Sequence, residues 1–172
     1  LDRLLGARIH RVGEGETPRG VLEACLADHA AAGRRGYVIP TGGSNAVGAL
    51  GYVRCGREIA AEMRERGLFP TAVIHATSTG GTQAGLLAGL ATAGLTTRVI
   101  GMNVYTEDSD GLRATVTRLT EEVLTRIAPG LAPGPGAVEA VDGPLGPGYG
   151  LPTPQMVEAV SLVARTEGIL LD

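Results

Sequence analysis

The chain has 172 residues, 44% of them apolar, and a formal net charge of −3 at pH 7. This length provides one domain or parts of two, with the apolar content usual for a globular protein. The negative balance argues against a nucleic-acid partner, because arginine pairs such as Arg34 with Arg35 and Arg64 with Arg66 are interleaved with acids or stand at helix ends.

The sequence also argues against a membrane segment and against a metal site. No apolar stretch approaches about 18 residues, and the start at Leu1 lacks the charged-then-apolar order of a signal peptide. We therefore expect no membrane segment and a cytoplasmic protein. Cys25 and Cys55 lie in helical patterns without a metal-ligand spacing, which predicts two buried free thiols. The histidines show no mutual spacing either, so no metal site is expected; they are His10, His29 and His75.

The first part of the chain alternates between strand and helix patterns. Strands are predicted over residues 8–12 and 37–40, and residues 18–32 form a helical pattern that Gly33 stops. A long helix is predicted over residues 45–66.

The ends of that long helix carry recognisable signals. Ser44 is suited to be its N-cap, because a serine hydroxyl can accept a hydrogen bond from a first-turn amide. Gly67 and Pro70 end it, since glycine favours the left-handed C-cap and proline cannot continue a helix.

The later part of the chain continues the alternation. Strands are predicted over residues 71–75, 97–104, 138–141 and 168–171, and helices over residues 83–93, 108–127 and 154–166. Residues 128–137 carry three prolines and three glycines and predict a surface connection. Alternation of this kind predicts an α/β protein with a parallel, doubly wound sheet.

A glycine-rich turn joins the strand at 71–75 to the helix at 83–93. The first amides of a helix have no partner within the helix, and the helix dipole adds partial positive charge, so a phosphate group can bind there. Gly80 and Gly81 allow close approach of the backbone. The hydroxyls that complete this candidate cradle belong to Ser78, Thr79 and Thr82.

Other interpretations of this turn are possible. A P-loop requires a lysine after its second glycine, and the chain has no lysine at all. A dinucleotide fingerprint requires a glycine where Thr82 stands and an acid about 20 residues later, whereas the first acid is Glu107. A plain tight turn that binds nothing stays open as an alternative.

Three segments together carry a family resemblance. The run S-T-G-G-T-Q-A-G from Ser78 to Gly85 resembles the phosphate loop of pyridoxal-phosphate enzymes of the tryptophan synthase β type. Residues 37–45, followed by G-A-L-G-Y at 48–52, resemble the D-cysteine desulfhydrase and 1-aminocyclopropane-1-carboxylate deaminase family. Residues 146–152, G-P-G-Y-G-L-P, are similar to that family's active-site tyrosine segment.

The resemblance implies a fold and a set of site residues. The fold would be a doubly wound, parallel, three-layer sheet of fold type II, incomplete at both ends, with residues 1–43 as the tail of the small domain and residues 44–172 as most of the large one. Pyridoxal 5′-phosphate would be the cofactor and a homodimer the assembly. The implied cofactor ligands are Ser78, Thr79, Gly80, Gly81, Thr82 and Gln83.

Three other residues receive individual predictions. Tyr149 would be catalytic, since a phenol can donate a hydrogen bond or relay a proton, although it could also merely pack over a glycine-proline turn. Ser44 and Asn45 would line the substrate carboxylate site, with the helix cap as an alternative role for Ser44. His75 is expected to be a strand-end residue more than a proton carrier.

The resemblance also implies an activity. The favoured reaction breaks down D-cysteine to pyruvate, sulfide and ammonia; the alternative is deamination of 1-aminocyclopropane-1-carboxylate. The family's Schiff-base lysine lies upstream of anything corresponding to Leu1, so this chain by itself is expected to be an inactive fragment. A third possibility, from another class, is a non-catalytic module that binds a phosphate ligand.

Overall fold

The computed structural model describes residues 1–105, 108–134, 136–143 and 145–171, and the chain divides into two compact units, Leu1–Ile39 and Pro40–Asp172. The domain boundary expected between residues 43 and 44 lies slightly beyond this division. Assignment of the two units to a small and a large domain stays a prediction.

The first unit contains one helix, α1, at Pro18–Ala31, which confirms the helix predicted at 18–32. Thr17 caps it by accepting a hydrogen bond from the Gly20 amide at 3.0 Å, and Pro18 occupies its first turn. The strands predicted at 8–12 and 37–40 are wrong: neither segment pairs with another described segment, and a strand exists only through such pairing.

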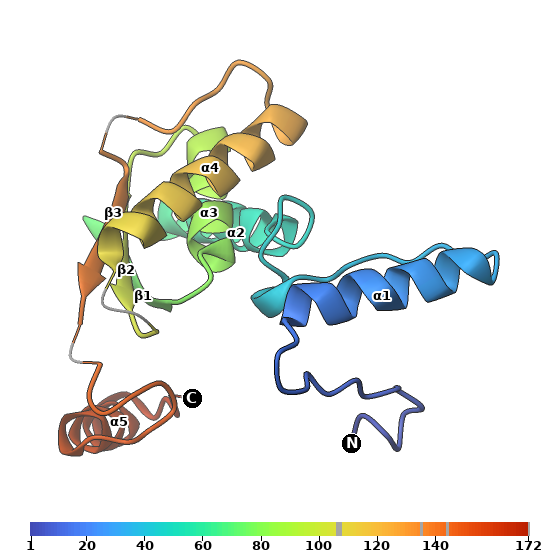
Figure 1. Ribbon diagram of the computed structural model, residues 1–172. Helices are drawn as coiled ribbons and strands as arrows, with labels where there is room; N and C mark the ends of the chain where they lie inside the picture. Colours follow the sequence, from blue (N-terminus) through green and yellow to red (C-terminus); the bar gives the residue numbers. More distant parts are fainter. Residues whose placement is uncertain (106–107, 135, 144, 172) are drawn as a thin grey trace. The chain divides into compact units, whose positions relative to one another are not determined.

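The second unit is built on a parallel sheet of three strands in the order β1-β2-β3. The strands are Ala72–Thr77, Arg98–Asn103 and Val138–Asp142, and the helices that connect them are α3 at Gly81–Thr92 and α4 at Ser109–Ile127 (Figure 1). All five elements confirm the predicted alternation, and each of their ends lies within two residues of the predicted end. Glu107, used above against a dinucleotide site, lies outside the described residues.

The core lies between one face of this sheet and helices α3 and α4. Val99 and Ala140 of the sheet are buried against helix side chains, because successive strand residues point to opposite faces and these two point inward. The other face is more open: Ile74 is 66% and Val141 44% exposed.

Two further helices complete the second unit. Helix α2, Leu50–Arg66, ends at Gly67 in the left-handed conformation (φ 62°), as predicted, but begins five residues later than the expected start at residue 45. Helix α5, Pro154–Glu167, is capped by Thr153 and confirms the pattern at 154–166. The strand predicted at 168–171 is wrong, since no described residue pairs with it.

Candidate functional site

The glycine-rich turn runs from the end of β1 to the start of α3. Gly80 is the N-cap of α3 and has φ 81°, a left-handed conformation that glycine adopts without strain. Among the residues that the structure describes, no side chain caps this helix. The first amides of α3 are therefore left to a partner outside the helix, which is the arrangement that a phosphate group requires.

A second glycine turn lies directly against the first. It comprises η1, the short 3-10 helix at Thr41–Gly43, and the following Ser44. The hydroxyls of Ser44 and Thr79 are 2.6 Å apart and share a hydrogen bond. A Cβ on Gly81 would lie 2.6 Å from the Ser44 hydroxyl oxygen, and one on Gly42 would collide with the Thr79 hydroxyl. The two turns therefore meet through glycines and two hydroxyls.

This contact corrects the capping role predicted for Ser44. Helix α2 has Ala49 as its N-cap, and no side chain of the described residues caps it. Asn45 instead caps an earlier turn, because its Oδ1 accepts from the amides of Val47 (3.0 Å) and Gly48 (2.8 Å). A side chain that satisfies two amides in this way favours a turn over a regular helix, which explains the late start of α2.

Helices α2 and α3 meet along a seam of glycines. A Cβ on Gly85 would lie 2.5 Å from both the Ala49 carbonyl oxygen and the Tyr52 Cβ, and one on Gly56 would lie 2.9 Å from the Leu86 carbonyl oxygen. Contacting positions rise together along both helices, so α2 and α3 run in the same direction. Their N-terminal ends, with the two glycine turns, consequently lie on one side of the unit.

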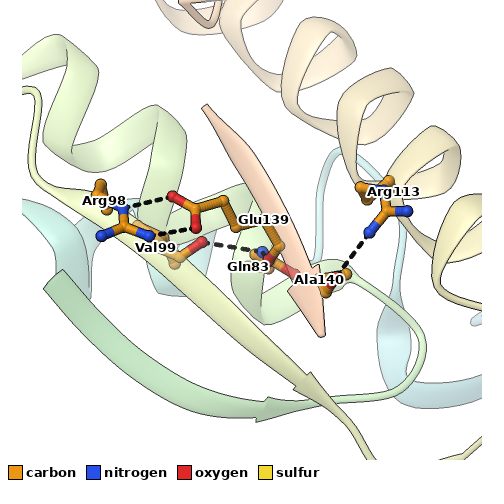
Figure 2. A network of polar contacts seen from close by, with 6 residues as sticks. All are labelled: Gln83, Arg98, Val99, Arg113, Glu139 and Ala140. Carbon is orange, nitrogen blue, oxygen red and sulfur yellow. Dashed lines mark hydrogen bonds and ion pairs between the residues drawn. The ribbon is translucent and has the colours of Figure 1, made fainter. Parts of the chain in front are cut away.

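Gln83 turns away from the turn that it follows. Its side chain is fully buried, and its Nε2 donates to the carbonyl oxygens of Val99 (3.1 Å) and Glu139 (2.6 Å). Figure 2 shows this amide reaching from α3 toward the strands, next to the ion pair between Arg98 and Glu139. The Gln83 side chain therefore joins α3 to β2 and β3. The group of Gln83 that a cofactor could contact is its backbone amide.

The Arg98 and Glu139 side chains form a two-bonded ion pair, each bond 2.6 Å long. Hydrogen bonding to Arg98 lowers the pKa of the Glu139 carboxyl, and the same contact raises the pKa of Arg98. The pair joins the exposed Arg98 of β2 to the half-buried Glu139 of β3 and belongs to the sheet rather than to the glycine turn.

His75 lies within β1, and its ring is committed to the strand. Nδ1 donates to the Ala76 carbonyl oxygen at 2.7 Å, while Nε2 is buried and has no partner in the described part of the chain. Burial lowers the pKa of His75, against the opposing effect of the hydrogen bond to Ala76. The neutral ring is therefore the form that the fold favours.

Tyr149 is 67% exposed and packs its ring edge-on against Tyr105, with ring centroids 5.7 Å apart. Tyr105 follows the carboxyl end of β2, and its amide is held by Asn103 at 3.2 Å. Open α/β sheets bind ligands at that end of their strands. The contact with Tyr105 therefore brings Tyr149 to the edge where β1 enters the glycine turn.

The residues of the turn fit a phosphate monoester. They offer an uncapped helix start, glycines at close approach, and the half-buried hydroxyls of Ser78, Thr79 and Thr82. The chain has no lysine, so no side-chain amine of these 172 residues can bond covalently to an aldehyde cofactor.

Other chemistry is not indicated in the described part of the chain. Its histidine, cysteine and acidic residues form no group that could hold a metal. Cys25 and Cys55 are free, as predicted, but they are half-buried rather than buried. Over the same residues no helix is long and apolar enough to cross a bilayer.

Sequence reasoning missed the pairing of the two glycine turns. The signal was present, because G-G followed by serine at 42–44 and G-G preceded by Ser78 and Thr79 both stand before helices. Their contact depends on the packing of α2 against α3, which local patterns do not specify.

Comparison with known proteins gives a consistent result. The family model described as "Pyridoxal-phosphate dependent enzyme" matches residues 1–172. A D-cysteine desulfhydrase of Yersinia enterocolitica is 41% identical over 142 residues, which cover 83% of this chain and 42% of the relative. A Thermotoga maritima protein named "Putative 1-aminocyclopropane-1-carboxylate deaminase" is 36% identical over 174 residues, covering all of this chain and 54% of the relative.

A solved structure agrees with these relatives. The crystal structure of an "ACC deaminase homologue" superposes with a TM-score of 0.73 at 28% identity, covering 99% of this chain and 51% of that one. This likeness confirms the expected α/β fold of type II. The chain spans about half the length of the relatives it matches.

Proposed function

Because the chain belongs to the family of pyridoxal-phosphate dependent enzymes, we propose that it forms the phosphate-binding part of an enzyme that breaks down a small amino acid. The observation that carries this proposal is the start of α3 after Gly80, which has no side-chain cap among the described residues. The hydrogen-bonded hydroxyls of Ser44 and Thr79 lie beside it. Negative charge at this position is stabilised by backbone amides without any need for a cationic side chain.

Each residue of the turn has a role in this proposal. The amides of Gly81, Thr82 and Gln83 would hold the phosphate oxygens, and the hydroxyls of Ser78 and Thr79 would complete the cradle. When bound, pyridoxal phosphate supplies an electron-withdrawing ring that stabilises negative charge beside the substrate's amino group.

The substrate would lie at the carboxyl edge of the sheet. The Tyr149 phenol would hold or move a proton there, since it is exposed and stands beside Tyr105. Asn45, whose Oδ1 accepts from two backbone amides, would lie beside the substrate carboxylate, as the family resemblance implies.

We favour D-cysteine as the substrate of the whole protein, released as pyruvate, sulfide and ammonia. Relatives named D-cysteine desulfhydrase support it at up to 41% identity, whereas those named for 1-aminocyclopropane-1-carboxylate deamination support the alternative at 36% and 28%. An assay of the whole protein with both substrates separates them. Sulfide release from D-cysteine is expected, and 2-oxobutanoate from the cyclopropane substrate alone would contradict it.

Binding to the chain itself can be tested without a lysine. Pyridoxine 5′-phosphate carries the ring and phosphate but no aldehyde, so its binding needs no amine. By titration calorimetry the chain is expected to bind this ligand and not pyridoxine, its form without phosphate. Equal affinity for the two ligands would show that the phosphate is not recognised and would contradict the proposal.

Three further expectations complete it. The chain by itself is expected to show no turnover, because it has no lysine. A homodimer and a cytoplasmic location of the whole protein follow from the family resemblance. Light scattering after size-exclusion chromatography and cell fractionation would test the last two.

A further inference from the structure

The contact between the two glycine turns fixes one hydroxyl of the candidate phosphate cradle. Thr79 lies within the cradle and Ser44 lies outside it in sequence, yet their hydroxyl oxygens are only 2.6 Å apart. Gly42, at φ 66°, has no Cβ, and a Cβ there would occupy the place of the Thr79 hydroxyl. The Thr79 side chain is therefore confined between Gly42 and Ser44.

The direction of this hydrogen bond depends on what the cradle holds. A hydroxyl has one proton to donate and two lone pairs that accept. A phosphate dianion can only accept, so the Thr79 proton must point to the phosphate when one is bound. Ser44 must then be the donor to Thr79.

We propose that Ser44 is a positioning residue that donates to Thr79 and so aims the Thr79 hydroxyl at a bound phosphate group; this rests on the function proposed above. A donor chain of this kind is cooperative, because each hydrogen bond polarises the next. The chemical class of ligand is a phosphate monoester, and Ser44 acts on it through Thr79.

A double-mutant cycle on the full chain tests this proposal. The variants are Ser44→Ala, Thr79→Val and the two combined, and the probe is pyridoxine 5′-phosphate measured by titration calorimetry. Thr79→Val is expected to weaken binding roughly 10- to 100-fold, the value of a hydrogen bond to a charged group. Ser44→Ala is expected to weaken it roughly three- to tenfold, and the double variant to bind no worse than Thr79→Val.

A matched control separates positioning from general stability. Ser109, the first residue of α4, is a buried serine whose hydroxyl has no partner among the described residues. Ser109→Ala is expected to leave the affinity unchanged. Thr79→Ser keeps the hydroxyl and is expected to retain the dependence on Ser44, and the phosphorus-31 resonance of the bound ligand should move in Ser44→Ala as in Thr79→Val.

The outcomes are distinct. Additive losses in the double variant would show that Ser44 contacts the phosphate directly. This result would overturn the positioning role of Ser44 but not the proposed function. Unchanged affinity in Ser44→Ala, or an equal loss in Ser109→Ala, would overturn it as well. If the unaltered chain does not bind pyridoxine 5′-phosphate, the proposed function fails and this inference fails with it.

Discussion

The Gln83 side chain has a different role in the structure from the one that the sequence predicted. Its position after S-T-G-G-T suggested a cofactor ligand, yet its amide is fully buried and donates to carbonyls on β2 and β3. Gly101 makes room for it, since a Cβ there would collide with the Gln83 Oε1. The Gln83 side chain therefore stabilises the packing of α3 against the sheet.

Replacing Gln83 by leucine should destabilise the fold. The buried carbonyl of Val99 and the partly buried carbonyl of Glu139 would lose a donor, and we expect the free energy of unfolding to fall by about 1–3 kcal/mol. Gln155, exposed in the first turn of α5, is the matched control, and Gln155→Leu should change stability by less than about 0.5 kcal/mol. Urea unfolding followed by circular dichroism measures both; equal effects would contradict the role given to Gln83.

His75 makes stability depend on pH. Because burial lowers its pKa in the folded state, the unfolded chain binds the proton more readily, and acid favours unfolding. Stability should fall as the pH drops from about 7 through the ordinary histidine pKa of about 6.5. His75→Asn, which keeps a donor for Ala76 but does not titrate there, should lose less stability over this range.

Exposed His10 provides the comparison for that experiment. The variant His10→Asn should keep the pH dependence of the unaltered chain in urea unfolding at pH 7 and pH 5. If His75→Asn also keeps this pH dependence of stability, a group other than His75 causes it.

At the scale of elements, sequence patterns predicted the helices and the paired strands well and failed where tertiary contacts decide. Amphipathic periods and caps placed α1, α4 and α5 within two residues of their ends. The strands expected at 8–12, 37–40 and 168–171 have no paired neighbour among the described residues, and the local sequence does not reveal whether a neighbour exists. The start of α2 was wrong because Asn45 satisfies two amides of its own turn.

The glycine seam between α2 and α3 gives a prediction at this scale. Gly56→Ala should destabilise the unit by about 1–3 kcal/mol, because the new methyl would press on the Leu86 carbonyl oxygen 2.9 Å away. Gly51, in the same helix, has nothing within 4 Å of such a methyl, and Gly51→Ala should stabilise by up to about 1 kcal/mol. Thermal unfolding of both variants tests the seam; destabilisation by Gly51→Ala would contradict it.

The whole molecule divides at Ile39, and the candidate phosphate site lies within the second unit. The family resemblance predicted a domain boundary between residues 43 and 44, and the sequence identified the glycine turn but not the partner turn at 41–44. That partner is fixed by α2 packing on α3, a long-range contact without a local signature. The roles of the site residues stay predictions until a ligand is tested.

Limited proteolysis should separate the two units. Trypsin has only arginines to cleave, and Arg34 and Arg35 are exposed in a segment without helix or strand. We expect an early product that begins at Gly36 and still binds pyridoxine 5′-phosphate, identified by mass spectrometry and calorimetry. Replacing both arginines by glutamine should remove this product. A first cut at an arginine inside α2 or α4, or loss of binding by the product, would contradict the division.

The edge-on contact between Tyr105 and Tyr149 has an optical consequence. The chain has four tyrosines and no tryptophan, so its ultraviolet emission comes from tyrosine without an indole to receive the energy. Two of the four rings meet beyond the carboxyl end of β2. A pyridine ring that binds there absorbs where tyrosine emits, so the molecule carries its own fluorescent reporter of whether that edge is occupied.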